Sequence, residues 1–165
     1  MMVNLPPMTD SAPRQSPFLL RRLAAMVYDT LLVAALIFVV MFIVLPVYSL
    51  LTGSHDSESV VQLDREIVWL VFLFTPMLFF CVFWLKNGQT LSMQAWRIKL
   101  VTFSGESPTL RQCVIRYFGA ILSAPLGLGY LWCLVDRNGR YWHDYLSGTE
   151  LILLPKPEKK KTSST

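Results

Sequence analysis

Arg22 and Asp29 are ionisable residues at the start of a long apolar stretch. They bracket "RLAAMVYD", and residues 30–51 that follow are almost wholly apolar. Seven positions turn an α-helix through about 700°, so both side chains share one helical face to within about 20°. A rise of about 10 Å separates them, too far for a direct one-turn pair. Because a carboxylate in an apolar setting needs a partner, these residues predict a polar site.

Two uses of such a site stay open. Ionisable groups inside a membrane are candidates for binding or moving an ion or a proton. A charge at the membrane edge costs less than one at the centre, however, so Arg22 and Asp29 can equally have a structural role that ties the first helix to the rest of the chain.

No other pattern in the chain indicates catalysis or metal binding. The histidines, His55 and His143, are far apart and near no cysteine, and the three cysteines form no CxxC pair. We interpret the cysteines as small buried hydrophobes. Nothing resembles a nucleophile–base pair or a phosphate-binding loop, so we expect no enzyme, no cofactor and no metal site.

The composition favours a membrane protein. Hydrophobic residues make up 53% and charged residues 16%, against about 25% charged in a typical soluble domain. The net charge is +4, which suits the basic cytoplasmic loops of membrane proteins. The basic residues border apolar runs and no nucleic-acid module surrounds them, so we expect no nucleic-acid partner.

Three apolar runs predict the elements that position the site. Residues 30–51 and residues 67–85, the latter without a charge, are each long enough to cross a hydrocarbon core of about 30 Å as a helix. The third run, residues 117–135, is broken by proline and glycine at 125–129. It predicts two short helical pieces with a bend, either re-entrant or spanning.

The distribution of charge predicts the topology. The loop of residues 52–66 is acidic, whereas the N-terminal flank, residues 86–116 and the C-terminal flank are basic. The positive-inside rule then places both termini in the cytoplasm and favours a re-entrant third segment over a spanning one. Residues 1–16 and the basic residues 155–165 are expected to be flexible tails.

A short β element is predicted beside the helices. Residues 96–103 alternate between apolar and basic side chains, and "ELILLP" at 150–155 is too short to span, so the two can pair if both are cytoplasmic. Residues 107–118 predict a helix at the membrane interface, with Ser107 as N-cap and Pro108 at its first position. The fold class is therefore an all-α membrane protein with a short cytoplasmic β element.

Several of these segments together resemble the RDD family of bacterial membrane proteins. The family is named for one arginine and two aspartates, and "RLAAMVYD" supplies the first two as Arg22 and Asp29. "GQTLSMQAWRIKLV" resembles the family segment after the second helix, with Ser92 at a usual glycine. "HDYLSGT" resembles its C-terminal motif and supplies Asp144. The resemblance covers about residues 17–154, which we take as one membrane domain.

The resemblance implies a site and a location. It implies a polar cluster of Arg22, Asp29 and Asp144, with His143, Arg137 and Arg140 as possible supporting residues. It implies a multi-pass protein of the bacterial inner membrane that transports an ion or small solute, or else a non-transporting assembly or interaction module. Two helices enclose no pathway, so besides the lipid bilayer we expect a homo-oligomer or a membrane-protein partner.

Overall fold

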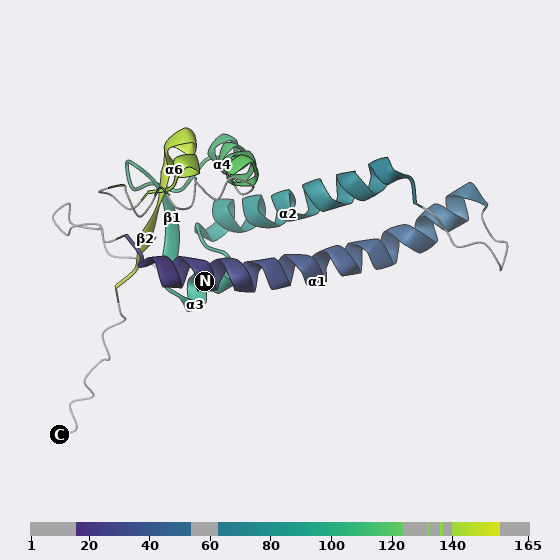
Figure 1. Cartoon of the computed structure of the whole chain (residues 1–165), viewed down its shortest axis with the longest axis horizontal. Helices are drawn as coiled ribbons and strands as arrows, with labels where there is room; N and C mark the ends of the chain where they lie inside the picture. Colours follow the sequence, from purple (N-terminus) through teal and green to yellow (C-terminus); the bar gives the residue numbers. More distant parts are fainter. Residues whose placement is uncertain (1–15, 54–62, 124–131, 133–135, 137–139, 156–165) are drawn as a thin grey trace, which may run out of the picture.

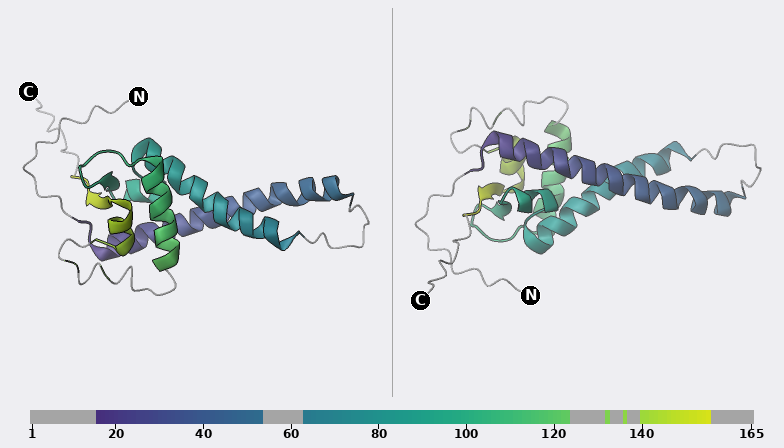
Figure 2. Two further views of the ribbon diagram at one scale, coloured as in Figure 1. Left: turned by 90° about the horizontal axis from the view of Figure 1, so that it is seen from above. Right: turned by 90° about the horizontal axis from the view of Figure 1, so that it is seen from below.

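Two long helices extend from a small group of short elements, which we call the head: α3 (Leu91–Ala95), β1 (Ile98–Thr102), α4 (Leu110–Ser123), α6 (Trp142–Ser147) and β2 (Thr149–Leu153). The computed structural model describes residues 16–53, 63–123, 132, 136 and 140–155. Helix α1 (Leu19–Thr52) and helix α2 (Arg65–Asn87) run side by side in opposite directions, and the remaining elements gather where α1 begins and α2 ends (Figure 1). Seen from above and below, the two helices cross at an angle (Figure 2). The head is therefore built around one end of a helical hairpin.

Both long helices are long and apolar enough to cross a membrane. Large apolar side chains lie exposed on them, for example Phe42 at 82% and Phe38 at 78%, as lipid-facing residues do. At 1.5 Å per residue, α1 is about 51 Å long and α2 about 35 Å, against a hydrocarbon core of about 30 Å. The helices predicted from residues 30–51 and 67–85 are confirmed, and α1 also extends N-terminally into the head.

A glycine ends α2 and turns the chain into the head. Gly88 has φ +68° and its backbone N–H donates to the Trp84 carbonyl. A Cβ at this position would lie 2.8 Å from the Leu100 carbonyl oxygen, so both the backbone conformation and the close approach require glycine. The turn leads directly into helix α3 (Leu91–Ala95).

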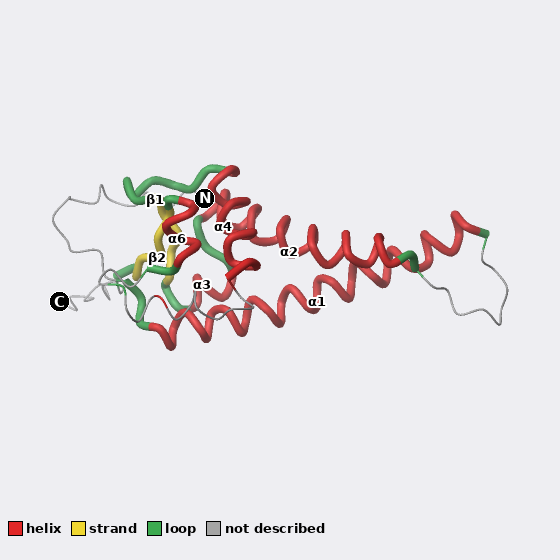
Figure 3. The backbone as a smooth tube through the Cα atoms, turned by 45° about the horizontal axis from the view of Figure 1, so that its top comes forward, coloured by secondary structure: helices red, strands yellow, loops and turns green. Residues whose placement is uncertain are grey.

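The head contains a two-stranded antiparallel sheet. Strand β1 (Ile98–Thr102) pairs with β2 (Thr149–Leu153), with Ile98 opposite Leu153 and Thr102 opposite Thr149 (Figure 3). The predicted pairing is thus confirmed. Two strands alone are barely stable in water, so packing must hold them. The shared core consists of Ala25, Cys81, Trp84, Met93, Ile98, Leu100 and Cys113.

Helix α4 (Leu110–Ser123) departs from its predicted capping. Its cap is Thr109, because the Thr109 N–H donates to Gln112 Oε1 and the Gln112 N–H donates to Thr109 Oγ1; the prediction of Ser107 and Pro108 was wrong. Arg116 of this helix is buried in the protein, whereas Leu122 is 75% exposed. The exposed side chains of α4 are mostly apolar, with Arg111 among them.

Helix α6 (Trp142–Ser147) packs against α4. A Cβ on Gly119 would lie 3.1 Å from the His143 Cβ, which shows how closely the two helices approach. Of the predicted third hydrophobic segment, residues 117–123 form the end of α4. Its proline and glycine interruption at 125–129 lies outside the described residues.

Candidate functional site

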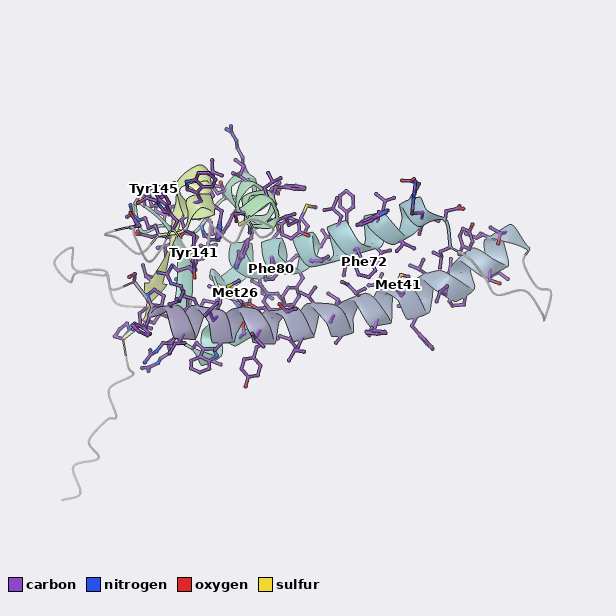
Figure 4. The ribbon with its side chains drawn as sticks, viewed as in Figure 1. Met26, Met41, Phe72, Phe80, Tyr141 and Tyr145 are labelled. Carbon is purple, nitrogen blue, oxygen red and sulfur yellow. The ribbon has the colours of Figure 1, made fainter. Side chains whose placement is uncertain are left out.

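A cavity of about 290 Å³ lies where the start of α1, the end of α2 and the head meet. Figure 4 places Met26 of α1 and Phe80 of α2 between the two helices at this end, with Tyr141 nearby in the head. The wall combines apolar side chains with polar and charged ones. The polar and charged members are Arg22, Asp29, Thr30, Arg116, Tyr117, Tyr141 and His143.

Asp29 is buried and hydrogen-bonded through one of its two carboxylate oxygens. The Thr90 hydroxyl donates to Asp29 Oδ2 over 2.7 Å. The same hydroxyl caps α3 by accepting from the Met93 N–H over 3.3 Å, and the Ser92 hydroxyl lies 3.0 Å from it. Among the described residues, nothing hydrogen-bonds Asp29 Oδ1. Asp29 therefore joins α1 to the cap of α3 and keeps one acceptor oxygen unused.

Arg22 is buried on the same face of α1. Its Nε donates to the Pro17 carbonyl over 3.0 Å, and its guanidinium carbon lies 4.8 Å from the centre of the Tyr141 ring. A cation over an aromatic face is stabilised by the ring's quadrupole. Arg22 Nη1 has no hydrogen-bond partner among the described residues. Like Asp29, Arg22 thus contacts the head and retains an unused hydrogen-bonding atom.

Asp144 is bonded through both oxygens. Oδ1 accepts from Arg116 Nη1 in an ion pair whose side chains are 1% and 5% exposed. Oδ2 accepts from the Tyr141 N–H over 2.8 Å, which caps α6. Arg116 Nη1 also donates to Thr149 Oγ1 over 2.9 Å. Asp144 and Arg116 therefore connect α4, α6 and β2.

His143 is neutral in this setting. Its ring stacks on Tyr141, with centroids 5.1 Å apart, and its Nε2 lies 3.9 Å from Asp144 Oδ1. The pKa of His143 is lowered to about 3, mainly by burial and then by the nearby positive charges of Arg116 and Arg22. The Asp144 carboxylate has the opposite, smaller effect. The imidazole therefore carries no charge at physiological pH.

The structure brings some of the six predicted residues together and separates others. Arg22, Asp29 and His143 line the cavity, and Asp144 lies behind it next to His143. No hydrogen bond or ion pair joins Asp29 to Asp144, both of which are described. Arg140 points elsewhere, with Nη2 2.6 Å from Glu150 Oε2. Arg137 lies outside the described residues.

Two site residues were missed from the sequence. From the sequence, Thr90 is part of the family segment after the second helix, and Arg116 is part of the helix predicted at residues 107–118; neither was predicted to belong to the site. The burial of Arg116 could have been predicted from its helix. When one face of a membrane-embedded helix is apolar and contacts lipid, a charged residue on the opposite face points into the protein. Within the described ranges, no group of three or more His, Cys, Asp or Glu side chains could hold a metal ion.

Comparison with known families gives a match over most of the chain. The profile described as RDD family matches residues 16–148, which include Arg22, Asp29 and Asp144. The chain belongs to the RDD family. RDD proteins are membrane proteins, in agreement with the two apolar helices of this one. No curated protein and no solved structure matches the chain.

Proposed function

We propose that this RDD protein binds an ion or a small solute in the cavity and moves it across the bacterial inner membrane, with Asp29 as the binding carboxylate. The observation that carries the proposal is the unused oxygen of a buried carboxylate in a cavity wall. Buried polar atoms are nearly always hydrogen-bonded, and exceptions are often functional.

Asp29 suits this role better than Asp144. A carboxylate that loads and releases a substrate must change its partner or its charge state during the cycle. Asp144 has both oxygens engaged by Arg116 and by a helix cap. Asp29 interacts with the Thr90 and Ser92 hydroxyls, and its Oδ1 has no hydrogen-bond partner among the described residues. We therefore assign binding to Asp29 and a structural role to Asp144.

The proposed orientation places the head in the cytoplasm. β1 follows α2 closely and pairs with β2 near the C-terminal end, so both segments lie at the same end of the helical hairpin. The loop between the helices is acidic and the head region is basic, which supports a cytoplasmic head with both termini inside. The protein is then multi-pass, with the cavity at the cytoplasmic edge of the membrane.

Transport requires more than one copy or a partner. Helices α1 and α2 form only a hairpin, and most of their apolar side chains face outward. We propose that a homo-oligomer or a membrane-protein partner completes the pathway.

A second function is favoured by a specific observation. The Arg116–Asp144 pair and the Asp29–Thr90 bond both join elements of the head to one another or to α1. Residues with this role alone would make the protein an assembly or interaction module without transport.

Ion flux separates the two functions. Wild-type protein is reconstituted in liposomes, and the internal pH is followed after Na⁺ or K⁺ gradients are imposed. Transport predicts wild-type flux that disappears in Asp29→Asn, while Glu66→Gln at the far end of α2 serves as the charge-matched control. Melting of the same preparations shows whether Asp29→Asn is folded. Absence of wild-type flux, with a melting temperature lowered by Asp29→Asn, would reject ion transport and favour the module.

A further inference from the structure

We propose that the cavity holds a small zwitterionic group, with its anionic end at Arg22 and its primary ammonium at Asp29. This inference rests on the proposed function in one respect, namely that the cavity is a binding site. It goes further by naming the chemical class of the occupant.

Two buried, opposite charges define the ends of this site. Arg22 is 4% exposed and Asp29 is 5% exposed, and both side chains line the cavity. Each has one atom without a hydrogen-bond partner among the described residues, Nη1 of Arg22 and Oδ1 of Asp29. A buried donor or acceptor left unpaired is costly, more so when charged. A ligand with an anionic and a cationic end satisfies both atoms at once.

The charge balance of the wall disfavours a single ion. Arg116 is matched by Asp144 in their ion pair, and His143 is neutral. Among the described residues, Arg22 and Asp29 are left as opposite charges without an ion-pair partner. A bare cation at Asp29 would share the cavity with the charge of Arg22, and a bare anion at Arg22 would face Asp29. A zwitterion adds no net charge and meets attraction at both ends.

The two unpaired atoms belong to residues seven positions apart on one face of α1. A ligand that meets both atoms therefore carries its two charges at separate ends. A carboxylate or phosphate joined to a primary ammonium by a short chain is the simplest ligand of this kind.

The volume and the apolar wall fit the same ligand. The cavity of about 290 Å³ lies at the lower limit of small-molecule pockets, roughly 300–1,000 Å³, and far exceeds what a bare ion fills. Met26, Phe80 and Ile121 contribute apolar surface to the wall. They can contact the carbon chain that links the two charged groups.

Two sources carry this chemistry. One is a free solute such as β-alanine or glycerophosphoethanolamine. The other is the headgroup of an ethanolamine phospholipid, which has the same phosphodiester, two-carbon link and ammonium. Choline headgroups serve as a control because a trimethylammonium has no N–H to donate to Asp29.

The test measures the melting temperature of the full-length protein in nanodiscs. In one arm, free glycerophosphoethanolamine or β-alanine is added to choline-lipid nanodiscs. In the other, an ethanolamine phospholipid replaces part of the choline lipid. A ligand that binds only the folded state raises the melting temperature. A rise of several degrees in the first arm supports a free zwitterion, and a rise in the second arm alone supports the lipid headgroup.

A ligand series in the wild type decides the proposal without any variant. Inorganic phosphate, ethanolamine and propionate each carry one of the charges, and each should give little or no rise. An equal rise in melting temperature with any one of them, or no rise in either arm, overturns the proposal of a zwitterionic ligand.

Variants then locate the two ends. Arg22→Gln and Asp29→Asn should each abolish the rise, whereas Arg21→Gln, the neighbouring charge outside the cavity wall, should keep it. A rise retained in Asp29→Asn overturns the proposal. Binding without flux in liposomes would contradict transport alone, and flux without zwitterion binding would contradict this inference alone.

Discussion

Arg116 and Asp144, 28 positions apart in the chain, form a buried ion pair that joins α4 to α6. Removal of one partner leaves an uncompensated charge in the protein interior. Replacement of both by apolar residues removes that penalty. The pair therefore makes a specific prediction about stability.

The single variants Arg116→Met and Asp144→Leu should each cost about 3–5 kcal/mol, and the double variant should cost clearly less than their sum. Reversible unfolding in detergent measures the four free energies of the cycle. Arg140→Gln is the control, because the Arg140 side chain is 26% exposed in its pair with Glu150 and should cost about 1 kcal/mol or less. Additive single costs at Arg116 and Asp144 would show that the pair is not coupled.

Thr90 should matter through its hydroxyl. Thr90→Val removes both the donor to Asp29 and the acceptor for the Met93 N–H, so we expect a loss of about 1–3 kcal/mol. Thr90→Ser keeps the hydroxyl and should retain most of the stability. Melting temperatures of the two variants check this. Equal losses in both would contradict a specific role for the hydroxyl, because Thr90→Ser keeps it.

His143 predicts a pH dependence of stability. Its pKa in the folded protein is about 3, against an ordinary value of 6.5, so the unfolded chain takes up the proton first. The stability from the neutral ring is fully present above pH 6.5 and is lost as the pH falls toward 3. The loss approaches about 1.4 kcal/mol per pH unit within this window.

The measurement is the melting temperature between pH 7 and pH 5, where ordinary carboxylates stay ionised. It should fall in the wild type and fall less in His143→Gln. Identical slopes for the two proteins would show that His143 does not take up a proton on unfolding in this range.

The proposed topology places the segment after α2 and the segment after β2 on the cytoplasmic side of the membrane. Reporter fusions at Gly88 and at Leu154 should both report a cytoplasmic position, because β1 and β2 pair at one end of the helical hairpin. An external reporter at Leu154 with an internal one at Gly88 would require a third crossing and contradict the topology.

The elements of the fold were predictable where one physical signal dominates. Continuous apolar runs gave α1 and α2, since few soluble structures tolerate such runs. Alternation gave β1 and its pairing with β2. The N-cap of α4 was missed because Ser107 and Thr109 are both good N-cap residues and Pro108 suits a first helical position. Only the reciprocal bonds with Gln112 single out Thr109.

The candidate site was predictable only in part. Helical spacing placed Arg22 and Asp29 on one face of α1, and the structure has both in one cavity wall. The partners of Asp29 and Asp144 could not be read in this way, because Thr90 and Arg116 are far from them in sequence and reach them only through tertiary packing. Asp144 and Asp29 therefore looked alike in the motif and differ in their bonding.

Asp29 has one oxygen without a partner among the described residues, whereas Asp144 has both oxygens bonded. The melting temperatures of Asp29→Asn and Asp144→Asn test the roles assigned to these two residues most directly. Asn at position 29 can still accept from Thr90, and it removes a buried charge with one unused oxygen, so its melting temperature should equal or exceed that of the wild type. Asn at position 144 leaves Arg116 without a counter-charge and should melt several degrees lower. A loss at position 29 as large as that at position 144 would contradict the claim that Asp29 is a binding residue and Asp144 a structural one.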